Sequence, residues 1–255
     1  GMNYGEQTKY VTWQFPTSLG TVELLQLTDV QFGHVCCKVN RVVEYRDWVL
    51  AAPNRFLLFC GDMIDAWAAW SPGSAFEQLG NPAAQLYRFC ELWAPARHRI
   101  LGYVGGNHEA RAIPAFGDLG CLIATLLKIP YSAGEQHLDI HFGKHAPFTV
   151  TLWHGRGAAQ TLGGIAQMLE RFSHRNDSQL AICGHLHRPM TIPLWTKHRA
   201  PRSRRLVLKK RIVGIGSSFL DHWNSYAEVK GLHAHDVLMV RAVLEPDGKW
   251  ECSLR

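Results

Sequence analysis

Five short apolar runs, each stopped abruptly by a polar residue or a glycine, constrain the fold of this chain most. They cover residues 22–27, 56–60, 100–104, 148–153 and 180–183. Runs of this length and β-branched content are typical of buried strands that end at the edge of a sheet. Helical patterns lie between them, at residues 39–51, 83–92, 119–127 and 165–172, whereas the part after about residue 190 reads mainly as strands. This alternation predicts a layered α/β domain and disfavours a helical bundle.

The composition indicates a globular chain with a sizeable core. Of its 255 residues, 47% are apolar and 19% are charged, a balance too apolar for a disordered chain. No internal repeat and no long linker rich in proline, glycine and serine interrupts the sequence. We therefore expect a single domain over residues 1–255, with loop insertions at 66–81 and after Trp195. Gly1 precedes Met2 and is interpreted as the remnant of a tag.

The sequence also bears on where the protein works. No apolar run is long enough to span a bilayer, and the N-terminus lacks the pattern of a signal peptide. The seven cysteines are odd in number, scattered and without a C-x-x-C pair, which indicates free thiols in a reducing compartment. We expect a cytoplasmic protein with no membrane partner.

The polar residues that stop the five runs offer metal-binding chemistry. They include Asp29, Asp62, Asn107, His154, His185 and His187. Ligands of open α/β sheets bind beyond the carboxyl ends of the strands, where such loops converge. A mixed set of oxygen and imidazole donors suits two divalent ions of Mn, Fe, Ni or Zn, whereas an all-oxygen set favours Mg or Ca and thiolates favour structural Zn.

The same residues carry a family resemblance. Five short motifs follow one another between residues 22 and 190: Asp29-x-Gln31, Gly61-Asp62-x-x-Asp65, Gly106-Asn107-His108-Glu109, His154-Gly155 and Gly184-His185-x-His187. In kind, order and spacing they resemble the motifs of the calcineurin-like metallophosphoesterases. One motif alone is a weak signal, but five in order are specific. The resemblance implies an α/β fold in which a β-sandwich is flanked by helices.

The resemblance further implies a two-metal centre in which Asp62 bridges both ions. The first ion would also bind Asp29, Gln31 and His187. The second would bind Asn107, His154 and His185. Two divalent ions facing two carboxylates leave a local charge of about +2, which attracts a phosphate ester and lowers the pKa of a bound water.

The implied activity is hydrolysis of a phosphoester by in-line attack of a metal-bound hydroxide. His108 resembles the catalytic histidine of the family, which contacts the phosphate and assists the departing oxygen, with Glu109 or Asp65 orienting its ring. Arg111 and Arg156 are candidates to clamp the phosphate with paired hydrogen bonds, and the alternative for each is a solvated loop arginine.

Gln31 departs from the family pattern, which usually has histidine there. Its amide oxygen is a harder and weaker donor than imidazole, so we expect the first metal position to be less fully occupied than the second. His34 could replace it if the loop bends back. Among divalent ions we expect manganese first, with Fe, Ni, Zn or Mg as alternatives.

The basic character of the chain is local. Residues 197–211 hold eight lysines and arginines and no acid, and because the whole chain carries +6, the remainder carries −2. Clustered charge of this kind often contacts phosphate backbones, and a solvated basic hairpin is the alternative. We expect Arg202, Arg204 and Arg205 to bind the substrate.

These observations favour a phosphodiesterase or nuclease, with DNA or RNA as the leading substrate class. Three alternatives stay open: an enzyme acting on a nucleotide or another small phosphoester, a protein phosphatase, and a non-catalytic protein-binding scaffold. Trp67 and Trp70 could stack on a nucleobase, but packing within a loop is the simpler expectation, and their spacing of three also fits one face of a short helix.

Overall fold

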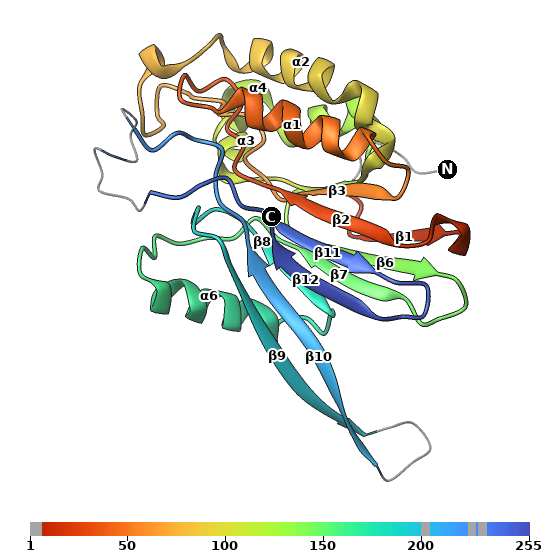
Figure 1. Cartoon of the computed structure of the whole chain (residues 1–255). Coiled ribbons are helices and arrows are strands. Elements are labelled where there is room, and N and C mark those ends of the chain that lie inside the picture. Colours follow the sequence, from red (N-terminus) through yellow and green to blue (C-terminus); the bar gives the residue numbers. More distant parts are fainter. Residues whose placement is uncertain (1–6, 200–204, 224–227, 229–233) are drawn as a thin grey trace.

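Two six-stranded sheets pack face to face, with helices covering the outer side of each (Figure 1). The structure is a computed structural model that describes residues 7–199, 205–223, 228 and 234–255. Its α/β architecture is the layered β-sandwich flanked by helices that the motifs imply.

The first sheet carries three of the five predicted strands. Its central strands β2, β3 and β4 are parallel, while β11 and β12 are antiparallel to their neighbours. In spatial order the sheet consists of β12 (Trp250–Leu254), β11 (Val240–Leu244), β2 (Val22–Leu27), β3 (Arg55–Phe59), β4 (Ile100–Val104) and β5 (Tyr131–Ser132).

The second sheet carries the other two predicted strands, β7 and β8, which are parallel. Its edge is a long antiparallel hairpin of β9 and β10, and β10 runs parallel to β8. In spatial order the sheet consists of β1 (Tyr10–Phe15), β6 (Gln136–Phe142), β7 (Phe148–Leu152), β8 (Leu180–Cys183), β10 (Leu206–Ile215) and β9 (Met190–Arg199).

Successive side chains along each strand point to opposite faces of the sheet and so divide the core into layers. On β2 and β3, Leu24 and Leu58 point between the sheets, where they pack with residues such as Val150 of β7. Their neighbours Leu25 and Leu57 point outward and pack under helices. Burial on both faces explains why these strands read as continuous apolar runs.

Helices α1, α2 and α5 cover the outer face of the first sheet, and α6 covers the second. Good caps define several of them: Asn81 Oδ1 accepts from Ala84 N at the start of α2, and Thr161 Oγ1 accepts from Gly164 N at the start of α6. The helices are α1 (Val39–Leu50), α2 (Pro82–Trp93), α3 (Asn107–Arg111), α4 (Ile113–Phe116), α5 (Leu119–Leu127) and α6 (Leu162–His174), with 3₁₀ turns η1 (Thr17–Leu19), η2 (Ala75–Glu77) and η3 (Ala94–Arg99).

The predicted strands and helices lie within a few residues of the observed ones, and the structure adds elements that were not predicted. Strands β1, β5 and β6 lie in parts of the chain where none was predicted. Residues 67–70 lie in a loop, as expected, and form no helix, so the alternative of a short helical face with Trp67 and Trp70 is wrong. Trp70 instead uses its indole Nε1 to donate to the backbone oxygen of Arg111. Among the described residues, no helix is long and apolar enough to cross a membrane.

Candidate metal centre

The five motifs meet at one edge of the sandwich. Asp29 and Asp62 follow β2 and β3, Asn107 opens α3 directly after β4, and the histidines follow β7 and β8. Backbone hydrogen bonds tie the loops together in pairs: Asp29 N donates to Gly61 O at 3.0 Å, and Gly184 N donates to His154 O at 2.9 Å. These hydrogen bonds and the strand ends together fix the relative positions of loops that are distant in the sequence.

Two motif glycines let carboxylates approach the neighbouring backbone. A Cβ atom at Gly106 would lie 2.1 Å from Asp62 Oδ1, and one at Gly184 would lie 2.4 Å from Asp29 Oδ2. Both distances are far below van der Waals contact. Glycine is required at 106 and 184 because any side chain would displace a carboxylate of the site.

The backbone of the site is held in an unusual conformation. Five of the seven predicted metal ligands have positive φ angles without being glycine, namely Asp29 (50°), Gln31 (47°), Asp62 (55°), His185 (76°) and His187 (55°). L-residues rarely adopt this left-handed region, and each instance costs roughly 1–3 kcal/mol that the surroundings must offset. Such strain concentrates at functional sites.

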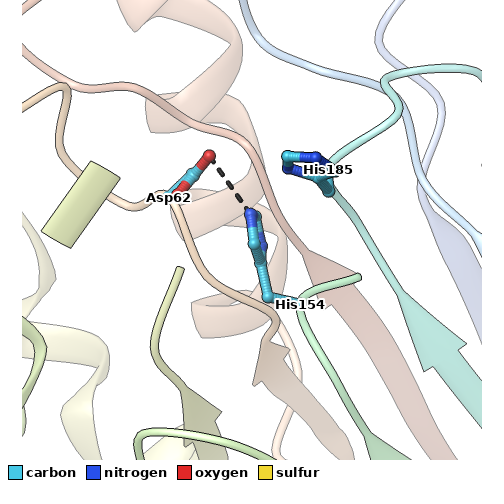
Figure 2. A group of neighbouring side chains, drawn as sticks. All are labelled: Asp62, His154 and His185. Carbon is cyan, nitrogen blue, oxygen red and sulfur yellow. Dashed lines mark ion pairs between the residues drawn. The ribbon is translucent and has the colours of Figure 1, made fainter. Parts of the chain in front are cut away.

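Three predicted ligands, Asp62, His154 and His185, form a compact group whose donor atoms all lie within 4.8 Å of one another (Figure 2). Asp62 Oδ2 is 3.2 Å from His154 Nε2. Asn107 Oδ1 joins the group, at 2.9 Å from His154 Nε2 and 2.8 Å from His185 Nδ1. Two ligand atoms that each lie about 2.1 Å from the same ion, at right angles to one another, are about 3 Å apart. The observed spacings of 2.8–3.2 Å therefore suit a shared cation.

His154 has an oxygen acceptor at each ring nitrogen. Its Nδ1 donates to the carbonyl of Cys60 at 2.8 Å, and its Nε2 faces the Asp62 carboxylate. A neutral imidazole has one proton and satisfies only one of them, so the ring needs a second proton or a cation at Nε2. Burial alone would lower the pKa of His154, but Asp62 raises it to about 10.

His185 is oriented in the same manner. Its Nε2 donates to the carbonyl of Gly157 at 2.8 Å, which leaves Nδ1 directed at Asn107 Oδ1. Hydrogen bonds from the far ring nitrogen to a carbonyl are the usual way in which proteins fix a metal-binding histidine. His154 and His185 thus present one ring nitrogen each to the same oxygen.

The second pair of predicted ligands lies beside this group. Asp29 is fully buried, and its Oδ1 is 3.0 Å from His187 Nε2 while its Oδ2 accepts from His185 N. Burial would raise the pKa of Asp29, but His187 and His154 outweigh it and lower the pKa. Burial would likewise raise the pKa of Asp62, but His108 and His154 outweigh it and lower the pKa. Both carboxylates are therefore negatively charged, which favours a bound cation.

Gln31 lies where the usual histidine would stand, but His34 does not fit as its replacement. Gln31 is buried, with Nε2 3.4 Å from His108 Nε2. The Nδ1 of His34 accepts a hydrogen bond from Cys36 N at 3.0 Å. That bond places the proton of the neutral ring on Nε2, so His34 presents a donor to the site and offers no lone pair there.

Of the two carboxylates considered for orienting His108, Asp65 is the one that contacts the ring. Its Oδ1 and its backbone oxygen each lie 2.9 Å from His108 Nδ1. Burial would lower the pKa of His108, but Asp62 and Asp65 outweigh it and raise the pKa. The ring is therefore held with Nδ1 on Asp65 and Nε2 directed toward Asp62 and Gln31.

The orienting carboxylate is itself held by a chain of two amide side chains, Gln78 and Gln85, that the sequence did not suggest. Gln78 Nε2 donates to Asp65 Oδ2 at 2.6 Å, and Gln78 Oε1 accepts from Gln85 Nε2 at 2.9 Å. Gln85 Oε1 accepts from Ala66 N at 2.8 Å. The loop insertion at 66–81 is thereby linked to the His108 ring.

The Glu109 carboxylate binds backbone amides of two neighbouring loops. This buried carboxylate accepts from the backbone amides of Asp62 (3.0 Å), Met63 (2.6 Å) and Gly106 (3.0 Å) and from the hydroxyl of Tyr103 (3.1 Å). Burial and the nearby Asp62 raise the pKa of Glu109. Four converging donors nevertheless make this carboxylate the element that joins the loops after β3 and β4.

A cavity of about 580 Å³ opens beside the predicted ligands. Arg111 lines it, and its guanidinium also binds the backbone oxygen of Asp65. Arg156 is exposed and lies outside the cavity wall, whereas Arg188 lines it and donates to the Gln160 carbonyl at 3.1 Å. Sequence reasoning missed Arg188, although it directly follows the last motif histidine.

Aromatic and imidazole side chains complete the cavity wall. Trp67 lies there, and so do His222 and His235 from the C-terminal part of the chain. Burial lowers the pKa of His235, and His187 and His222 add to the effect. The cavity is thus lined by groups able to bind both an anion and a flat ring.

Of the three arginines expected to bind the substrate, the one that the structure describes lies far from this centre. Arg202 and Arg204 fall outside the described residues, and Arg205 is an exposed residue next to β10. β10 spans ten residues from Leu206 to Ile215, which at about 3.3 Å per residue places its two ends roughly 30 Å apart. Ile215 is level with Cys183, next to the metal loop, so Arg205 is at the distant end.

Comparison with known proteins gives similarity in structure only. Neither a protein-family model nor a curated protein sequence matches the chain. Among solved structures, a metallophosphoesterase from Sphaerobacter thermophilus shares 15% identity at a TM-score of 0.42, over 92% of this chain and 87% of that one. Vps29 from Entamoeba histolytica complexed with Zn²⁺ shares 14% identity at a TM-score of 0.43, over 92% and 98%.

A third similar structure is the nuclease MPE of Pseudomonas putida, with 13% identity and a TM-score of 0.37 over 86% of this chain and 82% of that one. The resemblance to calcineurin-like metallophosphoesterases rests on the order of the motifs. At such identities and TM-scores, function has to be inferred from the side chains of the site itself.

Proposed function

We propose that this protein is a phosphoester hydrolase that depends on divalent metal ions. One observation carries the proposal: His154 lies between two oxygen acceptors, the Cys60 carbonyl and the Asp62 carboxylate, at the point where the other donor atoms converge. A cation at Nε2 satisfies this arrangement, and the donor set is the mixture of oxygen and nitrogen that first-row divalent ions prefer.

The proposed ligands fall into two groups around Asp62. Asp29, Gln31 and His187 would hold the first ion with it. Asn107, His154 and His185 would hold the second. When bound, such ions polarise a phosphoester and supply an activated water at neutral pH. Manganese is the ion we favour, because the amide oxygens of Gln31 and Asn107 are harder donors than imidazole.

His108 is proposed to act on the leaving group. Asp65 keeps the proton of Nδ1 in place, so that Nε2 is the atom that faces the site. When the ring is protonated, Nε2 can donate its proton to the departing oxygen. The strained backbone of the ligands supports a functional role for the whole group, because folding alone gains nothing from it.

The cavity supports a substrate of moderate size. A volume of about 580 Å³ is in the range of small-ligand pockets, which run from roughly 300 to 1,000 Å³. Arg111 and Arg188 supply positive charge for a phosphate, and Trp67 supplies a flat apolar wall. A phosphodiester with one organic group in the cavity fits these features, either as a small nucleotide or as the end of a nucleic acid.

The test is hydrolysis of three substrates: bis-p-nitrophenyl phosphate, p-nitrophenyl phosphate and single-stranded DNA. We expect turnover of the diester with Mn²⁺ and none after removal of metal with EDTA. Turnover that survives complete removal of metal would contradict the proposal. A protein that binds metal and hydrolyses none of the three would favour the scaffold alternative.

A further inference from the structure

The β9–β10 hairpin leaves one face of the second sheet without cover. Figure 1 shows the two strands extending beyond the rest of both sheets. Ile212 of β10 belongs to the core between the sheets, so Lys210, Leu208 and Leu206, at alternate positions, continue on the same face. Cover by the first sheet ends near Lys210, whose Nζ lies 4.9 Å from the Trp250 ring centroid.

The cross-strand register identifies the residues of this face, which we call the hairpin face. Lys210 pairs with Trp195, Leu208 with Lys197 and Leu206 with Arg199. Each pair joins one cation to one apolar side chain. Trp195, Leu206 and Leu208 are 61%, 68% and 62% exposed, and Lys197 and Arg199 are exposed as well.

The opposite face of the hairpin is different. Arg211 there is bonded to backbone oxygens of Ser173, Asn176 and Ser178 at the end of α6. Leu194 packs against the core under α6. Exposed apolar side chains thus lie together on the hairpin face with Lys197 and Arg199, which form no salt bridge within the described residues.

We propose that the hairpin face binds single-stranded nucleic acid. Lysine and arginine neutralise backbone phosphates, while an exposed tryptophan provides a surface on which bases stack regardless of sequence. A second copy of the chain is disfavoured, because a two-fold contact would bring Lys197 and Arg199 against their own equivalents. A lipid surface is disfavoured, because Arg199 and Arg205, the outermost described residues of the two strands, are cationic and the apolar groups lie along the length of the strands.

This binding site is independent of the metal centre. The far end of the hairpin is roughly 30 Å from it, a distance that several nucleotides of an extended single strand can span. A small phosphoester in the cavity would not reach the hairpin, whereas a long strand could contact both. If the proposed hydrolase acts on nucleic acid, the hairpin face holds the substrate away from the point of cleavage.

The experiment measures binding of a fluorescent single-stranded 20-mer by anisotropy, in EDTA so that hydrolysis does not contribute. Log affinity of the unmodified protein should fall with log salt. Lys197→Ser with Arg199→Ser should reduce the slope by about 1.4, since each phosphate contact contributes about 0.7. Trp195→Ala should weaken binding roughly 5- to 150-fold and leave the slope unchanged, because stacking releases no counterions.

A charge-matched control removes Lys209 from the opposite face and Arg171 from the exposed side of α6, both replaced by serine. This control should bind the 20-mer like the unmodified protein. Equal weakening by the control and by the double variant of the hairpin face would overturn the proposal. So would binding to phosphatidylserine vesicles or self-association through this face in the absence of DNA binding. These outcomes do not depend on whether the protein hydrolyses any phosphoester.

Discussion

Gln78 Nε2 donates a hydrogen bond of 2.6 Å to Asp65 Oδ2, on the oxygen opposite the one that contacts His108. The orientation of the proposed catalytic ring therefore depends on a residue of the 66–81 insertion. Gln78→Leu keeps the size of the side chain but removes this donor, so Asp65 should hold the ring less firmly.

For Gln78→Leu we expect a loss of kcat that depends on the leaving group. Hydrolysis of an alkyl phosphodiester, which needs a proton on its departing oxygen, should fall about 10- to 100-fold. Hydrolysis of bis-p-nitrophenyl phosphate, whose leaving group is stable as an anion, should fall less than about 3-fold. Gln160→Leu, at an exposed position on the cavity wall, is the control. Equal losses for both substrates would mean that Gln78 is only structural.

Glu109→Gln tests the junction between the loops after β3 and β4. The carboxylate of Glu109 now accepts hydrogen bonds from four donors. In the variant, the NH₂ group of the new amide is itself a donor, so it would face some of these donors and leave buried N–H groups unpaired. We expect the free energy of unfolding to fall by about 2–4 kcal/mol, measured by urea denaturation. Glu91→Gln, at an exposed position of α2, should change it by less than about 0.5 kcal/mol. Similar values for the two variants would refute the role assigned to Glu109.

The sequence predicted those features that are local in the chain. Strand ends, and the polar residues directly after them, are visible as apolar runs that stop, which is why Asp62, Asn107 and His154 could be placed at one edge before the fold was known. Gln78 and Gln85 could not be found this way, because their partners are set by the path of an irregular loop. Arg156 was predicted and Arg188 was missed for the same reason: both are near motif histidines, and only the loop geometry decides which one lines the cavity.

Gln31→His should increase occupancy of the first metal position. Imidazole binds first-row divalent ions more tightly than an amide oxygen does. We expect the unmodified protein to retain unequal amounts of the two ions after dialysis against a mild chelator, and to gain activity when Mn²⁺ is added. The variant should retain both ions, as measured by elemental analysis. Full and equal occupancy in the unmodified protein would show that Gln31 is an adequate ligand.

Metal binding should release protons, because His154 must give up the proton at Nε2. In the metal-free protein Asp62 raises its pKa to about 10, above its ordinary value of about 6.5. The proton therefore stabilises the metal-free protein fully below pH 6.5, and this contribution is lost as the pH rises through about 10. Apparent Mn²⁺ affinity should increase about tenfold per pH unit within this window. Calorimetry at pH 8 in two buffers of different ionisation heat measures the release, and its absence would contradict the ligand assignment.

We propose that Asp62 binds both ions, whereas His108 donates a proton to the leaving group. The decisive measurement is metal content and diester hydrolysis, determined on the same samples of Asp62→Ala and His108→Ala. Asp62→Ala should lose bound metal and all turnover, because one carboxylate supports both positions. His108→Ala should keep its metal and lose turnover about 10²- to 10⁴-fold. Equal loss of metal in both variants, or full turnover by Asp62→Ala, would contradict the account.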